Sequence, residues 1–244
     1  MSTPGAEIVP GRLYRRHSLA VRILHWVNVV AIVVLVMSGL QIFDAHPALY
    51  WGKSSYTGAG PIWAPGAFPG WATIPGTQWL SMGRRWHFFF AWIFVINGAA
   101  YLLYTIASRH LSRDLLPARG EMRTIGRSIV DHLHFRHPAG VEATRYNVLQ
   151  KLTYLAIIFV VLPLLVLMGL GMSPMVDAIA PGWVDLFGGR QSARTIHFIT
   201  AWAIVGFILL HLFMVVASGT WNNIRSMITG RYAIVPDPPL GDAP

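Results

Sequence analysis

The sequence contains no cysteine among its 244 residues. It therefore forms no disulfide and holds no iron–sulfur cluster through thiolates of its own. A haem that is ligated by thiolate, or attached covalently through a Cys-x-x-Cys-His motif, is excluded for the same reason. Any metal centre or prosthetic group has to be held by other residue types.

Charged residues are also scarce: they make up 12% of the chain, against 54% hydrophobic residues, and the mean hydropathy is +0.50. This composition is typical of an integral membrane protein. Four apolar runs without an acid or a lysine are long enough to cross a bilayer. They cover residues 23–43, 86–107, 152–172 and 195–217. We expect an all-α membrane protein, a four-transmembrane-helix bundle in membrane lipid, with a single domain over residues 1–244.

The net charge of +9 follows from the distribution of the 19 lysines and arginines between the loops. If both termini are cytoplasmic, 14 of these residues lie on the cytoplasmic side and 5 on the other side. The positive-inside rule then predicts an N-in, C-in orientation. The excess positive charge is therefore explained by topology, and we expect no nucleic-acid partner.

The loop between the first two spans is rich in glycine, proline and tryptophan. Tryptophan favours the membrane–water interface, where we expect Trp51, Trp63, Trp71 and Trp79 to lie. A loop of this length has two interpretations, a docking surface for another protein or a packed lid without a partner. The sequence does not decide between them.

The loop after the second span is the most basic segment of the chain. Its apolar spacing predicts a short amphipathic helix on the lipid surface between Pro117 and Pro138. Three histidines stand close together there, His132, His134 and His137. We interpret them as residues that face lipid headgroups rather than as a metal site. Residues 1–11, at the start of the chain, are predicted to be disordered.

Four of the ten histidines lie inside the spans: His25, His87, His197 and His211. The last two share one span and are 14 residues apart. On an α-helix they point about 40° apart and lie about 21 Å apart along the axis. Sorted by depth, His25 pairs with His211 near the cytoplasmic face, and His87 with His197 near the opposite face. Two imidazole pairs stacked in this way predict two bis-histidine b haems.

A single histidine in a membrane helix is often a hydrogen-bonding or proton-relay residue, so the prediction depends on all four together. A small-solute or metal transporter is the alternative from another class of protein. It would need carboxylates or another polar pathway near the midplane, and the spans contain no acid. Bis-histidine haem iron has no open coordination position, which favours electron transfer over oxygen binding.

Three of these histidines follow an arginine by three residues, which places the arginine on the same helix face, toward the water. The arginines are Arg22, Arg84 and Arg194. A guanidinium in this position can pair with a haem propionate, so we predict that all three bind the cofactor. Plain positive flanking of a span is the alternative. It suits Arg22 best, because Arg84 and Arg194 lie on the side where positive charge is sparse.

The histidines and the residues around them resemble a known family, the di-haem cytochrome b subunits of nickel–iron hydrogenases, respiratory formate dehydrogenases and thiosulfate reductases. The likeness extends from about Arg12 to Arg231. It is carried by the segment Arg22-Ile23-Leu24-His25-Trp26-Val27-Asn28, by His87 at the start of the second span, and by His197 and His211 in the last. The segment His46-Pro47-Ala48-Leu49-Tyr50-Trp51-Gly52 resembles the thiosulfate-reductase branch in particular.

The resemblance implies a multi-pass protein of the bacterial inner membrane, in a respiratory chain. Such a subunit passes electrons between the quinone pool and a catalytic oxidoreductase subunit at the outer, periplasmic face. Relatives in this branch imply a molybdopterin-type partner. Quinone would be an exchangeable substrate near the inner haem, with Asn28 as a candidate contact. A stand-alone quinone-coupled oxidoreductase is the alternative, and the sequence leaves open whether the chain is itself an enzyme.

Overall fold

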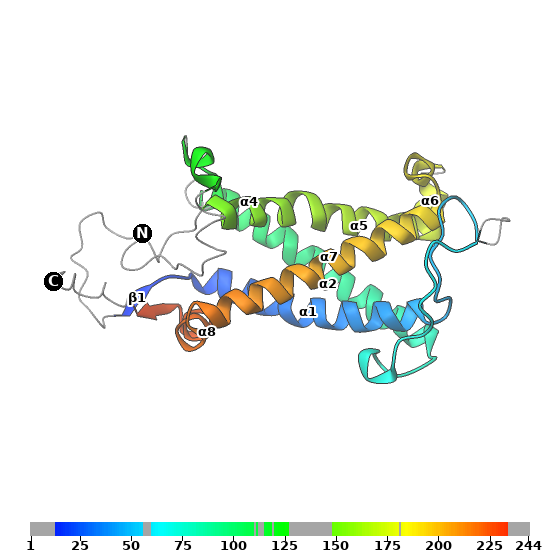
Figure 1. The fold of residues 1–244 in the computed structure, drawn as a ribbon, viewed down its shortest axis with the longest axis horizontal. Helices are drawn as coiled ribbons and strands as arrows, with labels where there is room; N and C mark the ends of the chain where they lie inside the picture. Colours follow the sequence, from blue (N-terminus) through cyan, green and yellow to red (C-terminus); the bar gives the residue numbers. More distant parts are fainter. Residues whose placement is uncertain are drawn as a thin grey trace. The chain divides into compact units, whose positions relative to one another are not determined.

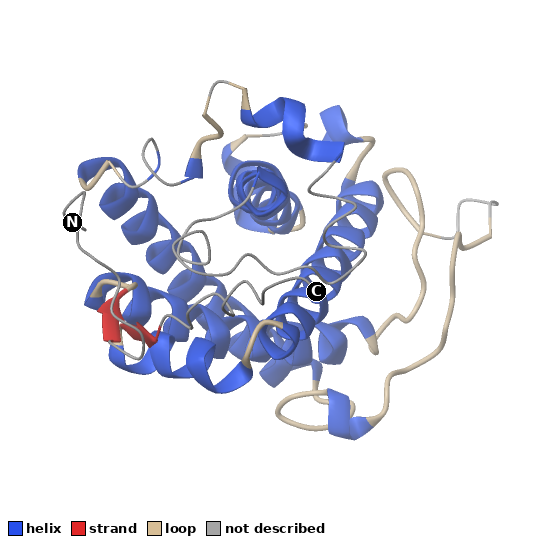
Figure 2. Cartoon of the chain, turned by 60° about the vertical axis from the view of Figure 1, so that its left-hand side comes forward, coloured by secondary structure: helices blue, strands red, loops and turns tan. Residues whose placement is uncertain are grey.

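The computed structural model describes residues 13–55, 60–109, 111, 115–118, 120–126, 148–180 and 182–233. Figure 2 shows that regular structure in these residues is helical except for one short pair of strands. Four helical segments are long and apolar enough to cross a membrane. They are α1 (Leu19–Phe43), α2 (Leu80–Ala107), the segment Val148–Gly171 and α7 (Arg190–Ala217) (Figure 1). The predicted four-helix membrane fold is confirmed, whereas the N-in, C-in orientation stays a prediction.

The helices begin earlier than the apolar runs predict. Three of them end at the predicted residues, Phe43, Ala107 and Ala217, and the third span ends at Gly171, one residue early. All four begin four to six residues before their apolar runs. The first N–H groups of a helix have no intrahelical partner in any case, and polar side chains are tolerated at the interface. Hydropathy alone therefore misses the first turn.

The third span is not one uninterrupted α-helix. A π-helical turn, Ile157–Val161, separates α4 (Val148–Ala156) from α5 (Leu162–Gly171). Pro163 is the second residue of α5, just after this turn. A proline has no N–H, and its ring crowds the carbonyl four residues earlier, so a wider turn just before it relieves the contact.

Shorter elements lie outside the spans, and the sequence does not predict them because they carry no long apolar run. They are β1 (Leu13–Arg15), η1 (Gly70–Ala72), η3 (Glu121–Thr124), α6 (Pro174–Ile179), η6 (Trp183–Phe187), α8 (Thr220–Thr229) and β2 (Arg231–Ala233). Most of the predicted amphipathic helix, and residues 1–11 that were predicted to be disordered, lie outside the described residues.

The chain divides into two compact units. The loop-side unit consists of residues 24–102 and 156–207, and the terminal unit consists of residues 1–23, 103–155 and 208–244. Each of the four long helical segments contributes one end to each unit. The single domain over residues 1–244 stays a prediction.

In the terminal unit, the two described ends of the chain lie side by side. Strand β1 pairs antiparallel with β2, with Tyr14 opposite Tyr232. The backbone N–H of Arg16 donates to the carbonyl of Gly230 at 2.8 Å, and the Arg16 guanidinium lies 4.5 Å from the centroid of the Tyr232 ring. An even number of spans requires both ends on one side of the membrane, and this pairing meets that requirement.

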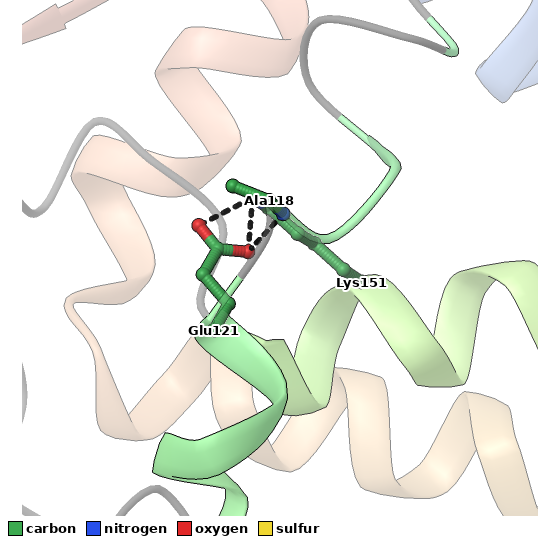
Figure 3. Close-up of polar contacts among 3 residues, drawn as sticks. All are labelled: Ala118, Glu121 and Lys151. Atoms are coloured by element: carbon green, nitrogen blue, oxygen red, sulfur yellow. Dashed lines mark hydrogen bonds and ion pairs between the residues drawn. The ribbon is translucent and has the colours of Figure 1, made fainter.

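An ion pair in the terminal unit joins the loop before the third span to its first helix (Figure 3). The Lys151 ammonium donates to both carboxylate oxygens of Glu121, at 2.9 and 3.0 Å, and the Ala118 N–H donates to one of them at 3.0 Å. These bonds, that of Lys151 first, hold the pKa of Glu121 below its ordinary value. Because Lys151 is buried, its charge needs such a partner.

In the loop-side unit, the loop after α1 is hydrogen-bonded to the first turns of α7. The carbonyl of Gly52 accepts from the Ser192 N–H at 3.2 Å, and the Gly52 N–H donates to the Ser192 hydroxyl at 2.8 Å. The Thr195 hydroxyl donates to the carbonyl of Tyr50 at 2.7 Å. These bonds fix the start of α7 against residues 50–52.

Gly189 allows this close approach. Its φ is +102°, and an added Cβ would lie 2.8 Å from the Cα of Lys53, so no other residue fits without movement of the backbone. The Lys53 ammonium lies 2.7 Å from the Asp185 carboxylate, an exposed ion pair that adds little to stability. A buried cluster of Met168, Val184 and Ala193 packs α5 and η6 against α7 beside it.

All four tryptophans of the loop after α1, Trp51, Trp63, Trp71 and Trp79, are exposed. The loop thus packs against α7 on one side and presents aromatic rings on another. Both interpretations of the loop, a docking surface and a lid, stay predictions.

Candidate functional site

Helix α7 runs without interruption from Arg190 to Ala217 and contains both His197 and His211, as the sequence predicts. The loop-side unit contains three of the four predicted ligands, His25, His87 and His197. The terminal unit contains His211.

The structure brings His87 of α2 and His197 of α7 together. Their ring centroids are 6.2 Å apart, and the ring planes are inclined by 68°. With metal–nitrogen bonds of about 2 Å and a ring centroid about 1.1 Å beyond each nitrogen, two imidazoles on opposite sides of one metal ion have centroids about 6.2 Å apart. The separation of the two ring centroids therefore fits two imidazoles that would bind one metal ion.

The ring of His87 lies against the C-terminal end of α1. Its Nδ1 is 3.1 Å from the hydroxyl oxygen of Ser38, which also donates to the carbonyl of Val34 at 2.6 Å. A Cβ added to Gly39 would lie 3.4 Å from Cε1 of His87, so the glycine makes room for the ring. The carbonyl of Leu35 also lies close to the ring.

The ring of His197 lies against α5 in a similar way. Its Nδ1 is 2.9 Å from the carbonyl oxygen of Leu165. A Cβ added to Gly169 would lie 3.3 Å from Cε1 of His197. The third span, which contains no histidine, thus positions one of the two rings.

These contacts define the protonation of both rings. A carbonyl oxygen only accepts, so Nδ1 of His197 carries the hydrogen and donates it to Leu165. Ser38 donates its own hydroxyl hydrogen to the carbonyl of Val34, so in the tautomer with a hydrogen on Nδ1 of His87 the Ser38 oxygen accepts that hydrogen. Both Nε2 atoms then keep a free lone pair, the form in which imidazole binds a metal. The two residues therefore fit a haem iron.

His25 contacts Trp26 edge to face, with ring centroids 5.3 Å apart. Its predicted partner, His211, is partly buried and belongs to the other unit. The pairing of these two histidines therefore stays a prediction.

Asn28, the candidate quinone contact, is engaged within the loop-side unit. Its amide oxygen accepts from Nδ2 of Asn97 at 2.8 Å, and the same Nδ2 donates to the carbonyl of Leu24 at 2.9 Å. Asn97 is buried. This polar contact joins α1 and α2 one turn from His25, and a quinone contact by Asn28 stays a prediction.

The guanidinium of Arg194 is bound to the loop after α1. It donates to the carbonyl of Ala48 at 2.9 Å and to that of His46, and it lies 5.4 Å from the centroid of the Phe43 ring. Burial, and secondarily the charge of Arg194, lowers the pKa of His46 from its ordinary value. Whether Arg194 also meets a propionate stays a prediction.

The other two predicted propionate partners also have protein contacts. The guanidinium of Arg84 lies 5.7 Å from the centroid of the Phe88 ring. That of Arg22 donates to the carbonyl of Ile228, at the end of α8 in the terminal unit. The propionate contacts of both arginines stay predictions.

His132, His134 and His137 lie outside the described residues. Among the residues that the structure does describe, no group of three or more histidine, cysteine, aspartate or glutamate side chains is placed to hold a metal ion. The His87–His197 pair differs from such a group because a haem iron takes only two ligands from the protein.

Sequence reasoning missed the residues that hold the two rings: Ser38, Gly39, Leu165 and Gly169. A serine followed by a glycine inside an apolar run was a usable signal, because both small residues let another group approach the helix closely. The carbonyl of Leu165 left no such signal, because every residue has one.

The family described as prokaryotic cytochrome b561 matches residues 16–230 of the chain. A protein of Azospira oryzae named "Putative protein-methionine-sulfoxide reductase subunit YedZ1" is 32% identical over 203 residues, 83% of this chain and 91% of that protein. A protein of Cupriavidus necator named "Probable Ni/Fe-hydrogenase B-type cytochrome subunit" is 26% identical over 225 residues, 88% of this chain and 80% of that protein.

The family match covers all four spans and all four predicted histidine ligands. It confirms the resemblance drawn from the sequence, and it disfavours the transporter alternative. The chain belongs to the prokaryotic cytochrome b561 family: it is a multi-pass bacterial membrane protein, a cytochrome of the b type that carries haem and transfers electrons.

Proposed function

We propose that the chain binds two b haems, one between His87 and His197 and the other between His25 and His211. The observation that carries this proposal is the 6.2 Å separation of the first two rings. The second pair is supported by the register of α7, which presents His211 within about 40° of His197 and about 21 Å further along the helix. Arg84 and Arg194 are proposed to meet propionates of the first haem, and Arg22 those of the second.

We propose that the two haems carry electrons across the membrane between the quinone pool and a partner oxidoreductase at the outer face. The position of His197 and His211 on one long helix supports this, because the edges of two haems held there would lie much closer together than their iron atoms. Bis-histidine iron has no open position for a substrate, so the chemistry belongs to quinone and to the partner. The predicted orientation places the His87–His197 haem at the outer face.

The partner is proposed to be a reductase of the molybdopterin type, which receives electrons from quinol through this chain. The name of the Azospira protein, a subunit of a methionine-sulfoxide reductase, supports a reductase. The Cupriavidus protein supports a second candidate, a hydrogenase partner, for which electrons would run in the opposite direction. The identity of 32% against 26% favours the reductase.

Quantification of haem against protein by the pyridine haemochrome method tests the cofactor proposal. We expect two haems per chain. A ratio near one contradicts the two-site version, and a ratio near zero contradicts haem binding altogether.

The partner is tested in membranes that contain the chain and its neighbouring gene products. Quinol should reduce the haems, and methionine sulfoxide should then reoxidise them if the partner is the reductase. Reduction of the haems by hydrogen gas identifies the hydrogenase instead. If the chain copurifies with no other subunit and still turns over quinol, the stand-alone alternative is correct.

A further inference from the structure

Two segments in different spans share the pattern Leu-Val-x-x-Gly-Leu. They are residues 35–40, Leu-Val-Met-Ser-Gly-Leu, in α1 and residues 165–170, Leu-Val-Leu-Met-Gly-Leu, in α5. In each segment an imidazole ring lies where a side chain on the glycine would point, that of His87 beside Gly39 and that of His197 beside Gly169. The same short sequence thus meets each of the two facing rings.

The pattern has a physical reason. In an α-helix, the side chain four residues after a carbonyl lies beside that carbonyl, and a glycine there leaves it open to another group. Gly39 is four residues after Leu35, and Gly169 is four residues after Leu165. The carbonyl of Leu165 accepts from Nδ1 of His197, and that of Leu35 lies close to the ring of His87. Each segment therefore offers room for the ring and an acceptor for its Nδ1 hydrogen.

The two segments differ at the residue before the glycine. Ser38 and Met168 are both fully buried. The Ser38 oxygen accepts from Nδ1 of His87, whereas Met168 packs in the apolar cluster beside α7. His87 therefore has a side-chain acceptor that His197 lacks.

We propose that residues 35–40 and 165–170 are a matched pair of ring seats that position the two axial ligands of one haem, and that Ser38 tunes the reduction potential of that haem. The proposal rests on the proposed His87–His197 haem site. Ser38, Gly39 and Gly169 are positioning residues, because they act through the two histidines.

The direction of the tuning follows from the hydrogen bond. An acceptor at Nδ1 makes the imidazole a stronger electron donor at Nε2. A stronger donor stabilises oxidised iron more than reduced iron, which lowers the reduction potential. Removal of the Ser38 hydroxyl should therefore raise the potential of this haem and leave the other haem unchanged.

The seats are tested with Gly39→Ala and Gly169→Ala, and with Gly206→Ala as the matched control. Gly206 is also a helix glycine, on α7, and an added Cβ there would meet no atom within 4 Å. It is nine residues from His197, which places it on the opposite face of α7. In haem titrations of each of the two purified seat variants, the haem affinity of one of the two sites should be about 10- to 100-fold lower than in the wild-type holoprotein. The control variant should show no change in haem affinity. Unchanged affinity in both seat variants overturns the proposal.

The role of Ser38 is tested by redox titration of Ser38→Ala, with Thr200→Val as its control. The Thr200 hydroxyl also bonds to its own helix, but its acceptors are the backbone carbonyls of Ile196 and His197 and not a ring nitrogen. We expect an upward shift of one midpoint potential in Ser38→Ala and none in Thr200→Val. Ser38→Cys, which keeps a similar volume but has a weak acceptor, should shift the same component in the same direction and serves if Ser38→Ala does not fold. If Ser38 were only structural, its replacement would shift neither midpoint potential, and that result overturns the proposed tuning.

These outcomes are separate from those of the proposed function. A wild-type chain without two haem components contradicts the proposed function itself. The other result is a wild-type chain with two haem components whose potentials and affinities stay the same when Ser38, Gly39 or Gly169 is replaced. That result contradicts only the proposed ring seats.

Discussion

The loop-side and terminal units use their polar contacts for different purposes. In the loop-side unit, Ser38 and the carbonyl of Leu165 bind the rings of two histidines, whose centroids lie 6.2 Å apart. In the terminal unit, Arg22 binds the carbonyl of Ile228 at the end of α8, and Lys151 binds Glu121, so these two contacts join segments of the chain. The comparison teaches that histidines alone do not identify a ligand site. The hydrogen-bond acceptor at Nδ1, on the side of each ring away from the metal position, is the more specific sign.

The predictions below test this difference, from the largest expected effect to the smallest. The first compares one histidine from each unit. His87→Ala should remove one haem component and spare the other, and His211→Ala should do the reverse. Each substitution leaves the iron with one protein imidazole and a weakly held macrocycle. Redox titration with optical spectra should show one surviving component in each variant, and a different one. Loss of the same component in both variants means that the pairing by depth is wrong.

A second comparison uses one glycine from each unit. Gly189 has φ +102° and would place a Cβ 2.8 Å from the Cα of Lys53, and Gly230 has φ +81° and would place one 2.8 Å from the carbonyl of His17. An L side chain in such a conformation costs about 1–2 kcal/mol, before the backbone contact is counted. Both alanine variants should therefore unfold at a lower temperature, followed by circular dichroism in detergent.

The two glycine variants should differ in their effect on haem. Gly189→Ala should also weaken the His87–His197 component, because it loosens the loop that is bonded to the start of α7. Gly230→Ala should spare that component. If both variants weaken the His87–His197 component equally, a change in the terminal unit affects haem binding in the loop-side unit, and the expected difference between the units is wrong.

The third prediction concerns the proposed propionate partners. A positive charge near the haem disfavours oxidised iron, so Arg84→Gln and Arg194→Gln should lower the potential of the His87–His197 haem. One unit charge at about 8 Å contributes about 2 kcal/mol at an effective dielectric near 20, and less with solvent access. Arg84→Gln is the cleaner test, because Arg194 also binds the carbonyls of His46 and Ala48. Arg22→Gln is the control and should leave this component unchanged. An unchanged or raised potential in both test variants identifies the arginines as membrane flanks only.

The smallest effect is expected in the terminal unit, at the Glu121–Lys151 pair. The folded-state pKa of Glu121 is lowered, chiefly by the hydrogen bond from Lys151. The pair therefore contributes stability above the unfolded pKa of about 4.3, and this contribution is lost as the pH falls through the folded pKa. Glu121→Gln should flatten the pH dependence of the unfolding temperature in that acidic range. The change should be about 1 kcal/mol or less, because the carboxylate is partly exposed. An identical pH profile for the variant and the wild type would show that the ion pair is not formed in solution.

The sequence predicts the four spans and their C-terminal ends well, because hydropathy is a property of each segment alone. It also predicts that His197 and His211 share one helix. It misses α8 and the β1–β2 pair, because these are short and are stabilised by contacts between the two ends of the chain. It misses the seats at Gly39 and Gly169 for a related reason, since a seat exists only where one particular helix crosses another.

The sequence by itself determined that this is a four-span, cysteine-free membrane protein whose candidate ligands are histidines at fixed depths. Hydropathy and the 3.6-residue helical period act along a single segment, so they can be read without knowing its neighbours. Only the tertiary structure decided which oxygen and which glycine meet each ring, and that Arg194 binds the loop after α1. Those contacts join residues far apart in the sequence, and they depend on how side chains of different helices interdigitate, which the sequence of one helix does not specify.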